Sequence, residues 1–128
     1  MNWLDSIPSA LLQKDLDGLW ARQQAISDNM ANIETPGYKE KNVSFENQLE
    51  NAVQGKEDTE ADTIDRIGKV QPFTAENSDQ TYRADGNGVD LEQQMIEMSR
   101  TSLNYSYSLQ TMSDYFSRLK TAITGSGR

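Results

Sequence analysis

Apolar side chains recur at alternating intervals of four and three residues at both ends of the chain. A repeat of about 3.5 residues is typical of a coiled-coil seam, in which two helices share one apolar stripe. The expected helix-packing positions form an N-terminal ladder of Leu12, Leu16, Leu19, Ile26, Met30 and Ile33, and a C-terminal ladder of Leu91, Met95, Met98, Tyr105, Leu109, Met112, Phe116, Leu119 and Ile123. Gln23 and Ser102 fill the polar positions of the two ladders, where they either set the register or are tolerated exceptions.

Local signals give these two helices their predicted ends. The first is predicted over residues 8–34, because proline fits a first helical turn and Pro36 keeps the residue before it out of the α region. The second is predicted over residues 90–124, with Asp90 as its cap and Gly125 as its stop. We therefore expect a mainly α fold in which the terminal helices pair as an antiparallel coiled coil.

The middle of the chain carries no such ladder, and residues 35–89 are expected to be an irregular central segment of one domain, 1–128. Apolar residues recur every four positions over residues 43–53, which predicts a short amphipathic helix. Residues 54–63 are almost all polar and predict a mobile linker. Residues 64–73 are interpreted as a region that holds a short strand.

Two glycine-containing loops border this central segment. Thr35-Pro36-Gly37-Tyr38 is typical of a type II turn, in which proline presets φ at the second position and glycine supplies positive φ at the third. The loop Asp85-Gly86-Asn87-Gly88 leads directly into the second long helix.

Composition favours assembly over chemistry. Apolar residues make up 35% of the 128 residues, and they gather in the two ladders. The net charge is −8 and no basic patch stands out, so neither nucleic acid nor direct lipid binding is expected. The chain contains no histidine and no cysteine, which removes the commonest general base and the commonest metal ligands. The N-terminal residues lack the features of a secretory signal peptide, so export by that route is not expected.

Candidate chemical sites have simpler structural interpretations. The loop that begins at Asp85 resembles the start of a calcium-binding loop, but Asp90 stands where that loop requires glycine and Ile96 where it requires glutamate. Glu92 and Glu97 lie five residues apart, so they do not share a helix face as a catalytic pair would. No catalytic, metal-binding or cofactor-binding residue is predicted, and the chain is not expected to be an enzyme.

Two motifs nevertheless resemble those of a known family. The run Asn29-Met-Ala-Asn-Ile-Glu-Thr-Pro-Gly-Tyr-Lys39 resembles the N-terminal signature of bacterial flagellar axial proteins, the rod, hook and hook-associated subunits. The run from Asp85 to Glu92, with Met95 and Met98 after it, is similar to that of the proximal-rod proteins of the flagellar basal body. The motif and turn positions are Asn29, Asn32, Thr35, Pro36, Gly37, Tyr38, Asp85, Gly86, Asn87, Val89 and Glu92. Residues 50–80 show no match.

The resemblance implies a specific role. Such a chain would be a structural subunit of the basal-body rod that assembles through its terminal helices into a hollow, torque-transmitting axle. The implied partners are other flagellar rod subunits, the rod-base adaptor FliE, the membrane ring and export gate, and copies of itself. The implied location is extracytoplasmic, in the flagellum basal body, reached through the flagellar type III apparatus without a cleaved signal.

Two other hypotheses fit the ladders alone. A soluble coiled-coil adaptor or a type III secretion chaperone would also need paired helices, and the two loop motifs argue against both. Similarly, the turn over residues 35–38 either positions the segment after the first helix against neighbouring subunits or simply stops the helix.

Overall fold

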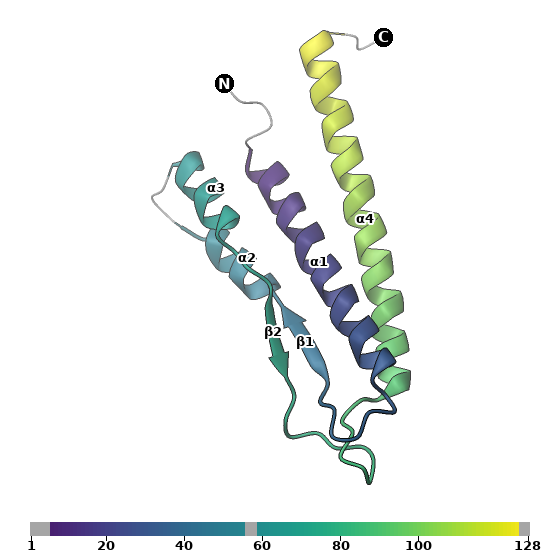
Figure 1. The fold of residues 1–128 in the computed structure, drawn as a ribbon. Helices are drawn as coiled ribbons and strands as arrows, with labels where there is room; N and C mark the ends of the chain where they lie inside the picture. The colour runs from purple at the N-terminus through teal and green to yellow at the C-terminus, as the bar shows by residue number, and fades with distance from the viewer. Residues whose placement is uncertain (1–5, 56–58, 126–128) are drawn as a thin grey trace.

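The computed structural model describes residues 6–55 and 59–125. Its elements, in chain order, are α1 (Ile7–Ala31), β1 (Lys41–Ser44), α2 (Glu46–Val53), α3 (Glu60–Gly68), β2 (Phe73–Glu76) and α4 (Leu91–Thr124). Helix α1 lies in the middle, with α4 along one side and the short helices and strands along the other (Figure 1). No helix within the described ranges is long and apolar enough to cross a membrane.

The two long helices pair in opposite directions, as the ladders predict. Ser6, just before α1, shares a hydrogen bond with Tyr115 far along α4. Asp15 accepts a hydrogen bond from Ser108, and Asn29 Nδ2 donates to Gln94 Oε1 at 3.0 Å. Residue numbers rise along α1 as they fall along α4, so the predicted antiparallel pairing is confirmed.

The ends of both helices follow their local signals. Ser6 caps α1, and Pro8 stands in its first turn. Helix α1 ends at Ala31, before the predicted end, and Asn32 Nδ2 donates to the Asp28 carbonyl at 2.8 Å beyond it. Helix α4 has 34 residues, the Asp90 carboxylate accepts the first free N–H groups, and Gly125 stops the helix with φ 64°.

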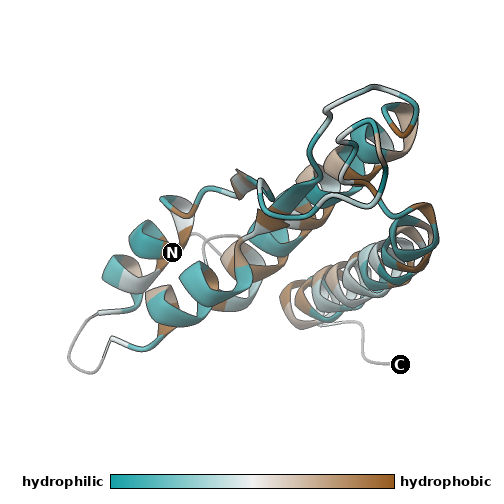
Figure 2. Ribbon diagram, turned by 90° about the horizontal axis from the view of Figure 1, so that it is seen from below, coloured by the Kyte–Doolittle hydropathy of each residue, from teal (hydrophilic) through white to brown (hydrophobic). Residues whose placement is uncertain are grey.

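The main apolar core lies between α1 and the central segment. Its buried members are Leu19, Ala25, Val43, Phe45, Leu49, Ala52, Ile67 and Val70. Phe45 and Ile67, with 1% and 0% of their surfaces exposed, are the largest fully buried apolar side chains among the described residues. Helices α2 and α3 therefore form a second layer on α1, rather than a loose connection between two paired helices. Figure 2 shows apolar segments on the sides where these helices face each other.

Parts of the central segment differ from expectation. The linker expected over residues 54–63 is shorter, because α3 begins at Glu60. This helix starts with a capping box, in which Thr59 and Asp62 exchange hydrogen bonds. Residues 56–58 of the expected linker lie outside the described ranges. The strand expected over residues 64–73 is wrong for most of that range, which continues α3 to Gly68. Here the apolar residues follow the helical period, and their burial against α1 and α2 decides the conformation.

The two strands overlap the expected elements only in part. Strand β1 takes the residues just before α2, so the helix expected over residues 43–53 begins only at Glu46. Strand β2 begins at Phe73 and pairs with β1 in antiparallel register, with Lys41 opposite Glu76 and Ser44 opposite Phe73. The pairing is a ribbon of two strands, and α1 supports it on the β1 side.

The C-terminal ladder spreads over two faces of α4. The less exposed positions recur as Gln94, Met98, Thr101, Tyr105, Ser108, Met112, Tyr115 and Leu119, again at intervals of four and three. The ladder members Leu91, Met95, Leu109 and Ile123 remain 43–61% exposed. In the N-terminal ladder Leu19 and Ile26 are buried, and Leu12, Leu16, Met30 and Ile33 are half-buried. The seam of the single chain is thus shifted by one position toward polar residues of α4.

A glycine in the middle of α1 lets the core close. An added Cβ at Gly18 would lie 2.5 Å from ring atoms of Phe45, so the ring packs directly against the helix backbone. Arg22, one turn later, places its guanidinium carbon 5.0 Å from the centre of the same ring. Its Nη2 also donates to the Val43 carbonyl at 2.9 Å and contacts Glu46 Oε1 at 2.6 Å. Gly18 and Arg22 are four residues apart, so Phe45 packs against one face of α1 and is contacted there by both residues.

We predict that Gly18→Ala destabilises the chain although alanine is the better helix former. The gain in helix propensity is about 1 kcal/mol. Overpacking against Phe45 costs about 1–3 kcal/mol, because a buried ring has little room to shift. Urea unfolding followed by circular dichroism measures the difference. The matched control is Gly68→Ala, where an added Cβ meets nothing within 4 Å. A Gly18→Ala chain as stable as the native one would contradict this packing.

We predict that the Arg22–Glu46 contact makes stability sensitive to acid. Burial alone would raise the pKa of Glu46, but the backbone N–H groups of Glu46 and Phe45 and the Arg22 guanidinium lower it below its ordinary value of 4.5. Its contribution is therefore complete above the unfolded-state pKa and is lost as the pH falls through the folded-state pKa.

Replacement of Glu46 by Gln should therefore cost a few tenths to about 1 kcal/mol at neutral pH, since the side chain is half exposed. At a pH below the lowered pKa, the Glu46→Gln and native chains should unfold alike. Glu50→Gln is the matched control, because Glu50 accepts a hydrogen bond from Gln54 on the same helix instead of pairing with an arginine. An equal stability difference at every pH would exclude the charge as the cause.

Candidate functional site

The two loop motifs meet at one end of the molecule, where α1 ends and α4 begins (Figure 1). They lie more than forty residues apart in the sequence, yet they share backbone and side-chain hydrogen bonds. We call this region, residues 29–41 together with residues 80–94, the junction. It is the place where the motif positions gather, so it is the candidate functional site.

The turn after α1 has the predicted geometry. The Tyr38 N–H donates to the Thr35 carbonyl at 3.3 Å, and Gly37 has φ 72°, so the predicted positive φ is confirmed. The Gly37 N–H donates to the Asp85 carbonyl at 3.0 Å, which ties the turn to the second loop. A Cβ at Gly37 would meet nothing within 4 Å, so a side chain there strains the backbone without a clash.

Asn87 joins the two loops from a fully buried position. Its Nδ2 donates to the carbonyls of Asn32 at 2.9 Å and Thr35 at 2.8 Å, just beyond the end of α1. Its Oδ1 accepts from the Val89 N–H at 2.9 Å, two residues before α4 begins. A single carboxamide therefore sets the exit of one long helix relative to the entrance of the other.

A second buried carboxamide, that of Asn29, lies in the last turn of α1. Asn29 Nδ2 donates to the Lys41 carbonyl at 2.9 Å, and its Oδ1 accepts from the Lys41 N–H at 2.8 Å. The same Nδ2 donates to Gln94 Oε1, and Gln94 Nε2 donates to Glu40 Oε1 at 3.0 Å. The Asn29 side chain therefore pairs with the backbone of β1 at Lys41, as a neighbouring strand would, and it also holds the first turn of α4 through Gln94.

Tyr38 is the second donor to Asn29, after the Lys41 N–H. Its hydroxyl donates to Asn29 Oδ1 at 3.3 Å. Partial burial, and then the nearby carboxylates of Asp28 and Glu76, raise the pKa of Tyr38 above its ordinary value of 10.0. The hydroxyl therefore keeps its proton at neutral pH and remains a donor to the amide oxygen.

Charged side chains hold the outer edge of the junction. Lys39 Nζ donates to Thr81 Oγ1 at 2.9 Å and to the Gly86 carbonyl at 3.0 Å. Arg83 Nη1 donates to the Ile33 carbonyl at 2.8 Å and lies 3.3 Å from Glu34 Oε1. Lys39 and Arg83 therefore each link the first loop to the second at the surface, as Asn87 does in the interior.

The remaining motif positions have different surroundings. Gly86 has φ 84°, and a Cβ there would lie 3.5 Å from Gly37 Cα, so the two glycines pack against each other. Val89 is buried, whereas Thr35, Pro36, Asp85 and Glu92 are exposed. The structure thus brings the motif loops together but leaves one edge of them open to solvent.

Sequence reasoning missed Gln94 and Glu40, and it included Lys39 only as the last residue of the first motif, without a predicted contact. Gln94 is one of the most buried polar side chains described, at 1% exposure, and it falls one position before a ladder residue. A second ladder through polar positions of α4 was present in the sequence, and it would have pointed to Gln94 as a seam residue. Nothing in the local pattern marks Glu40 or Lys39, whose partners lie more than forty residues away.

The arrangement fixes geometry and offers no catalytic grouping. Its buried members are amides, a carboxylate, a valine and backbone groups, and every buried side-chain nitrogen and oxygen in the described ranges has a partner. Within those ranges no group of three histidine, cysteine or acidic side chains could hold a metal ion. A fully satisfied polar cluster of this kind restricts the chain to one arrangement, because any shift leaves buried groups unpaired.

We predict that Asn87→Ala loosens both loops together. The substitution leaves the carbonyls of Asn32 and Thr35 without their donor, at a cost on the order of 1–3 kcal/mol. Amide hydrogen exchange should show lost protection in residues 35–38 and in residues 86–94 at once. Asn47→Ala, on the exposed face of α2, is the matched control. Lost protection in only one loop would contradict the coupling.

Known proteins bear out the resemblance. No protein-family model matches the chain. It is 31% identical to the flagellar basal body rod protein FlgB of Bacillus subtilis over 130 residues, 95% of this chain and 93% of that protein. It is 33% identical to FlgB of Aeromonas hydrophila over 81% of this chain and 83% of that protein, and 29% identical to FlgB of Escherichia coli over 86% and 89%. The chain therefore belongs to the FlgB family of flagellar basal body rod proteins.

Proposed function

We propose that the chain is a structural subunit of the flagellar basal-body rod, which assembles through its terminal helices into a hollow, torque-transmitting axle. Its relatives carry the name of that rod. The observation that carries the proposal is the junction, which joins two long helices through fully paired buried amides. A subunit that transmits torque needs a fixed angle between its helices, and the junction supplies one.

The two long helices suit this role mechanically. Helix α4 has 34 residues and is therefore roughly 50 Å long. It pairs with α1 over most of the length of α1, and α1 is supported on its other side by α2, α3 and β1. A stack of three layers resists bending better than a single helix. The ladder members that remain exposed on α4 are available for contact with neighbouring subunits.

The partners and the route follow from the same role. The proposed partners are other rod subunits, the adaptor FliE at the rod base, the membrane ring and the export gate. The proposed route is the flagellar type III apparatus, through which a subunit passes unfolded. The chain has no cysteine, so no disulfide has to be broken before it unfolds.

We propose that the turn after α1 acts by orienting the two long helices within the subunit. Gly37 contacts Asp85 of the same chain, while Thr35 and Pro36 stay exposed at the edge of the junction. The exposed edge is then presented at a fixed angle to neighbouring subunits. This makes the turn more than a helix stop, since its geometry decides where both helices point.

We predict that Gly37→Val blocks rod formation more than export. Valine is strongly disfavoured at φ 72°, so the turn would have to change its backbone conformation. Motility and isolated basal bodies report on rod formation, and the amount of exported chain is measured separately. Gly37→Asn is the matched control, because asparagine tolerates this region.

Cells that lack the chain provide the test of the proposed function itself. They should be non-motile, their basal bodies should lack a rod, and the native chain should restore both. Complete rods in those cells would refute the rod function and favour an adaptor or chaperone. Normal rods with Gly37→Val would instead show that the turn only ends the helix.

A further inference from the structure

We propose that the open face of α1 receives the outer face of α4 from a second copy of the chain. The inference rests on the proposed function, because it names one contact through which copies would join. Two surfaces that the fold leaves unpartnered carry it. One is apolar and basic, the other is aromatic and acidic, and they lie on different helices.

The first surface is the outer stripe of α4, defined here by Ile96, Arg100, Leu103 and Tyr107. These residues are spaced by four, three and four positions, so they share one face of the helix. Ile96, Leu103 and Tyr107 are 52%, 72% and 77% exposed. Neighbouring residues of α4 that pack on α1, such as Thr101 and Tyr105, lie on the other side of the helix. The stripe therefore faces away from the subunit with three large apolar side chains.

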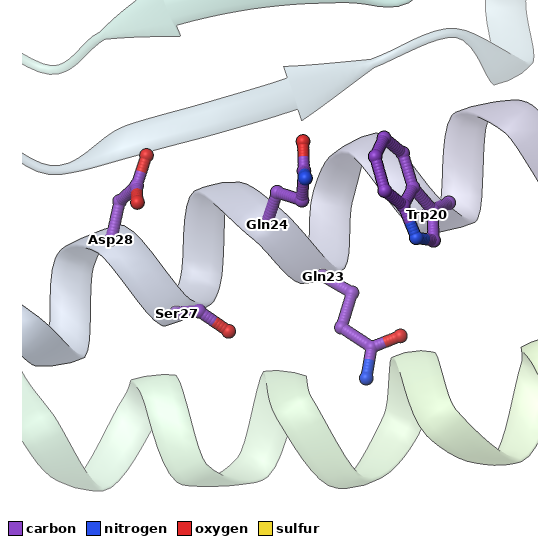
Figure 3. A pocket seen from close by; sticks show the side chains of 5 residues that line it. All are labelled: Trp20, Gln23, Gln24, Ser27 and Asp28. Atoms are coloured by element: carbon purple, nitrogen blue, oxygen red, sulfur yellow. The ribbon is translucent and has the colours of Figure 1, made fainter.

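The second surface is the α1 groove, lined by Trp20, Gln23, Gln24, Ser27 and Asp28. Figure 3 shows these side chains along α1, with the strands on one side and α4 on the other. The groove is shallow and open, with a volume of about 540 Å³. Trp20 stands at one end and is 55% exposed, which is unusual for so large an apolar ring. A helix face with protruding apolar side chains has the shape to cover it.

The charges of the two surfaces are complementary. The groove ends at Asp28, and Asp17 is exposed one turn before Trp20. No lysine or arginine is among the described residues that line the groove. The outer stripe carries Arg100, whose side chain is 66% exposed and meets Glu97 only at 3.4 Å. Asp28 is 60% exposed and lies 3.9 Å from Lys41 Nζ. Both groups can therefore take a new partner, and such rim pairs set register and exclude wrong pairings.

The contact does not close on itself. A copy that covers its neighbour's groove with its own α4 still has its own groove free for the next copy. Such heterologous contacts build an open series unless the rotation closes a ring. Pairing of two outer stripes around a two-fold axis would leave both Trp20 side chains exposed and would leave Asp28 without a basic partner from the second copy. The observations therefore favour the α1 groove as the site that binds the outer stripe of α4 from a second copy.

A photo-cross-linker at Tyr107 tests the contact in the full chain. Tyr107 is replaced by p-benzoylphenylalanine, and basal bodies from cells that make this chain are irradiated and digested with trypsin. Cleavage after Lys14, Arg22 and Lys39 releases two groove peptides, residues 15–22 and residues 23–39. We expect adducts to these peptides in a band of twice the chain's mass. The cross-linker at Tyr82, which is 54% exposed at the junction, is the matched control and should not yield them.

Charge reversal provides an independent measurement. Arg100→Glu should lower the yield of the adduct several-fold, and Arg100→Glu combined with Asp28→Arg should restore it. Ser113→Glu adds a negative charge to another exposed face of α4 and should leave the yield unchanged. Adducts between two α4 peptides, or no adduct between copies in basal bodies that contain the chain, would overturn the inference while the rod function stands. Absence of the chain from basal bodies would overturn the rod function and the inference with it.

Discussion

The carboxamide of Asn29 holds three parts of the chain in one arrangement, and the rest of the structure depends on it. It pairs with both backbone groups of Lys41 on one side and with the Gln94 side chain on the other. Burial of an amide without its partners costs on the order of 1–3 kcal/mol for each lost bond. A slip of α4 by one residue would remove Gln94 from Asn29 and from Glu40 together. The buried polar pairs at the junction therefore favour one register of the long helices, and the half-buried apolar residues Met98, Tyr105 and Met112 add contacts further along the seam.

This constraint explains where the apolar residues go. Because Gln94, Thr101 and Ser108 occupy the seam, apolar residues of the C-terminal ladder such as Met95 and Leu109 turn partly toward solvent. The main core then forms on the opposite side of α1, around Phe45 and Ile67 of the central segment. Helix α1 is buried between two layers, whereas α4 packs on one side only. The helix with the least support inside the subunit is thus the one with the most apolar surface left over.

Much of the fold was predictable because its signals are local. The cap at Asp90, the stop at Gly125 and the positive φ at Gly37 follow from single residues and are confirmed. The antiparallel pairing follows from two matched ladders. Helix α3 was missed because it is short, and its burial against α1 and α2 comes from contacts that no local pattern shows. Its capping box at Thr59 and Asp62 was the available signal.

The two loops of the candidate site could be predicted from the sequence, but the hydrogen bonds that join them could not. The motif residues named both loops, but nothing in them says that Asn87 reaches the carbonyls of Asn32 and Thr35, more than fifty residues away. Nor does the pattern choose between two ladders that differ by one position on α4. An apolar ladder and a polar one both fit a repeat of about 3.5 residues.

The use of the more polar of the two α4 ladders for packing on α1 has a physical consequence for assembly. The polar pairs in the intramolecular seam are specific but individually weak, because each pair exchanges hydrogen bonds with water for hydrogen bonds with protein and gains about 1 kcal/mol. An apolar face that stays exposed gains its free energy only when another surface covers it. The chain therefore keeps its specific contacts for folding and a large share of its hydrophobic free energy for association. Coverage of the exposed apolar residues of α4 by another surface would therefore add hydrophobic free energy that the single chain does not gain.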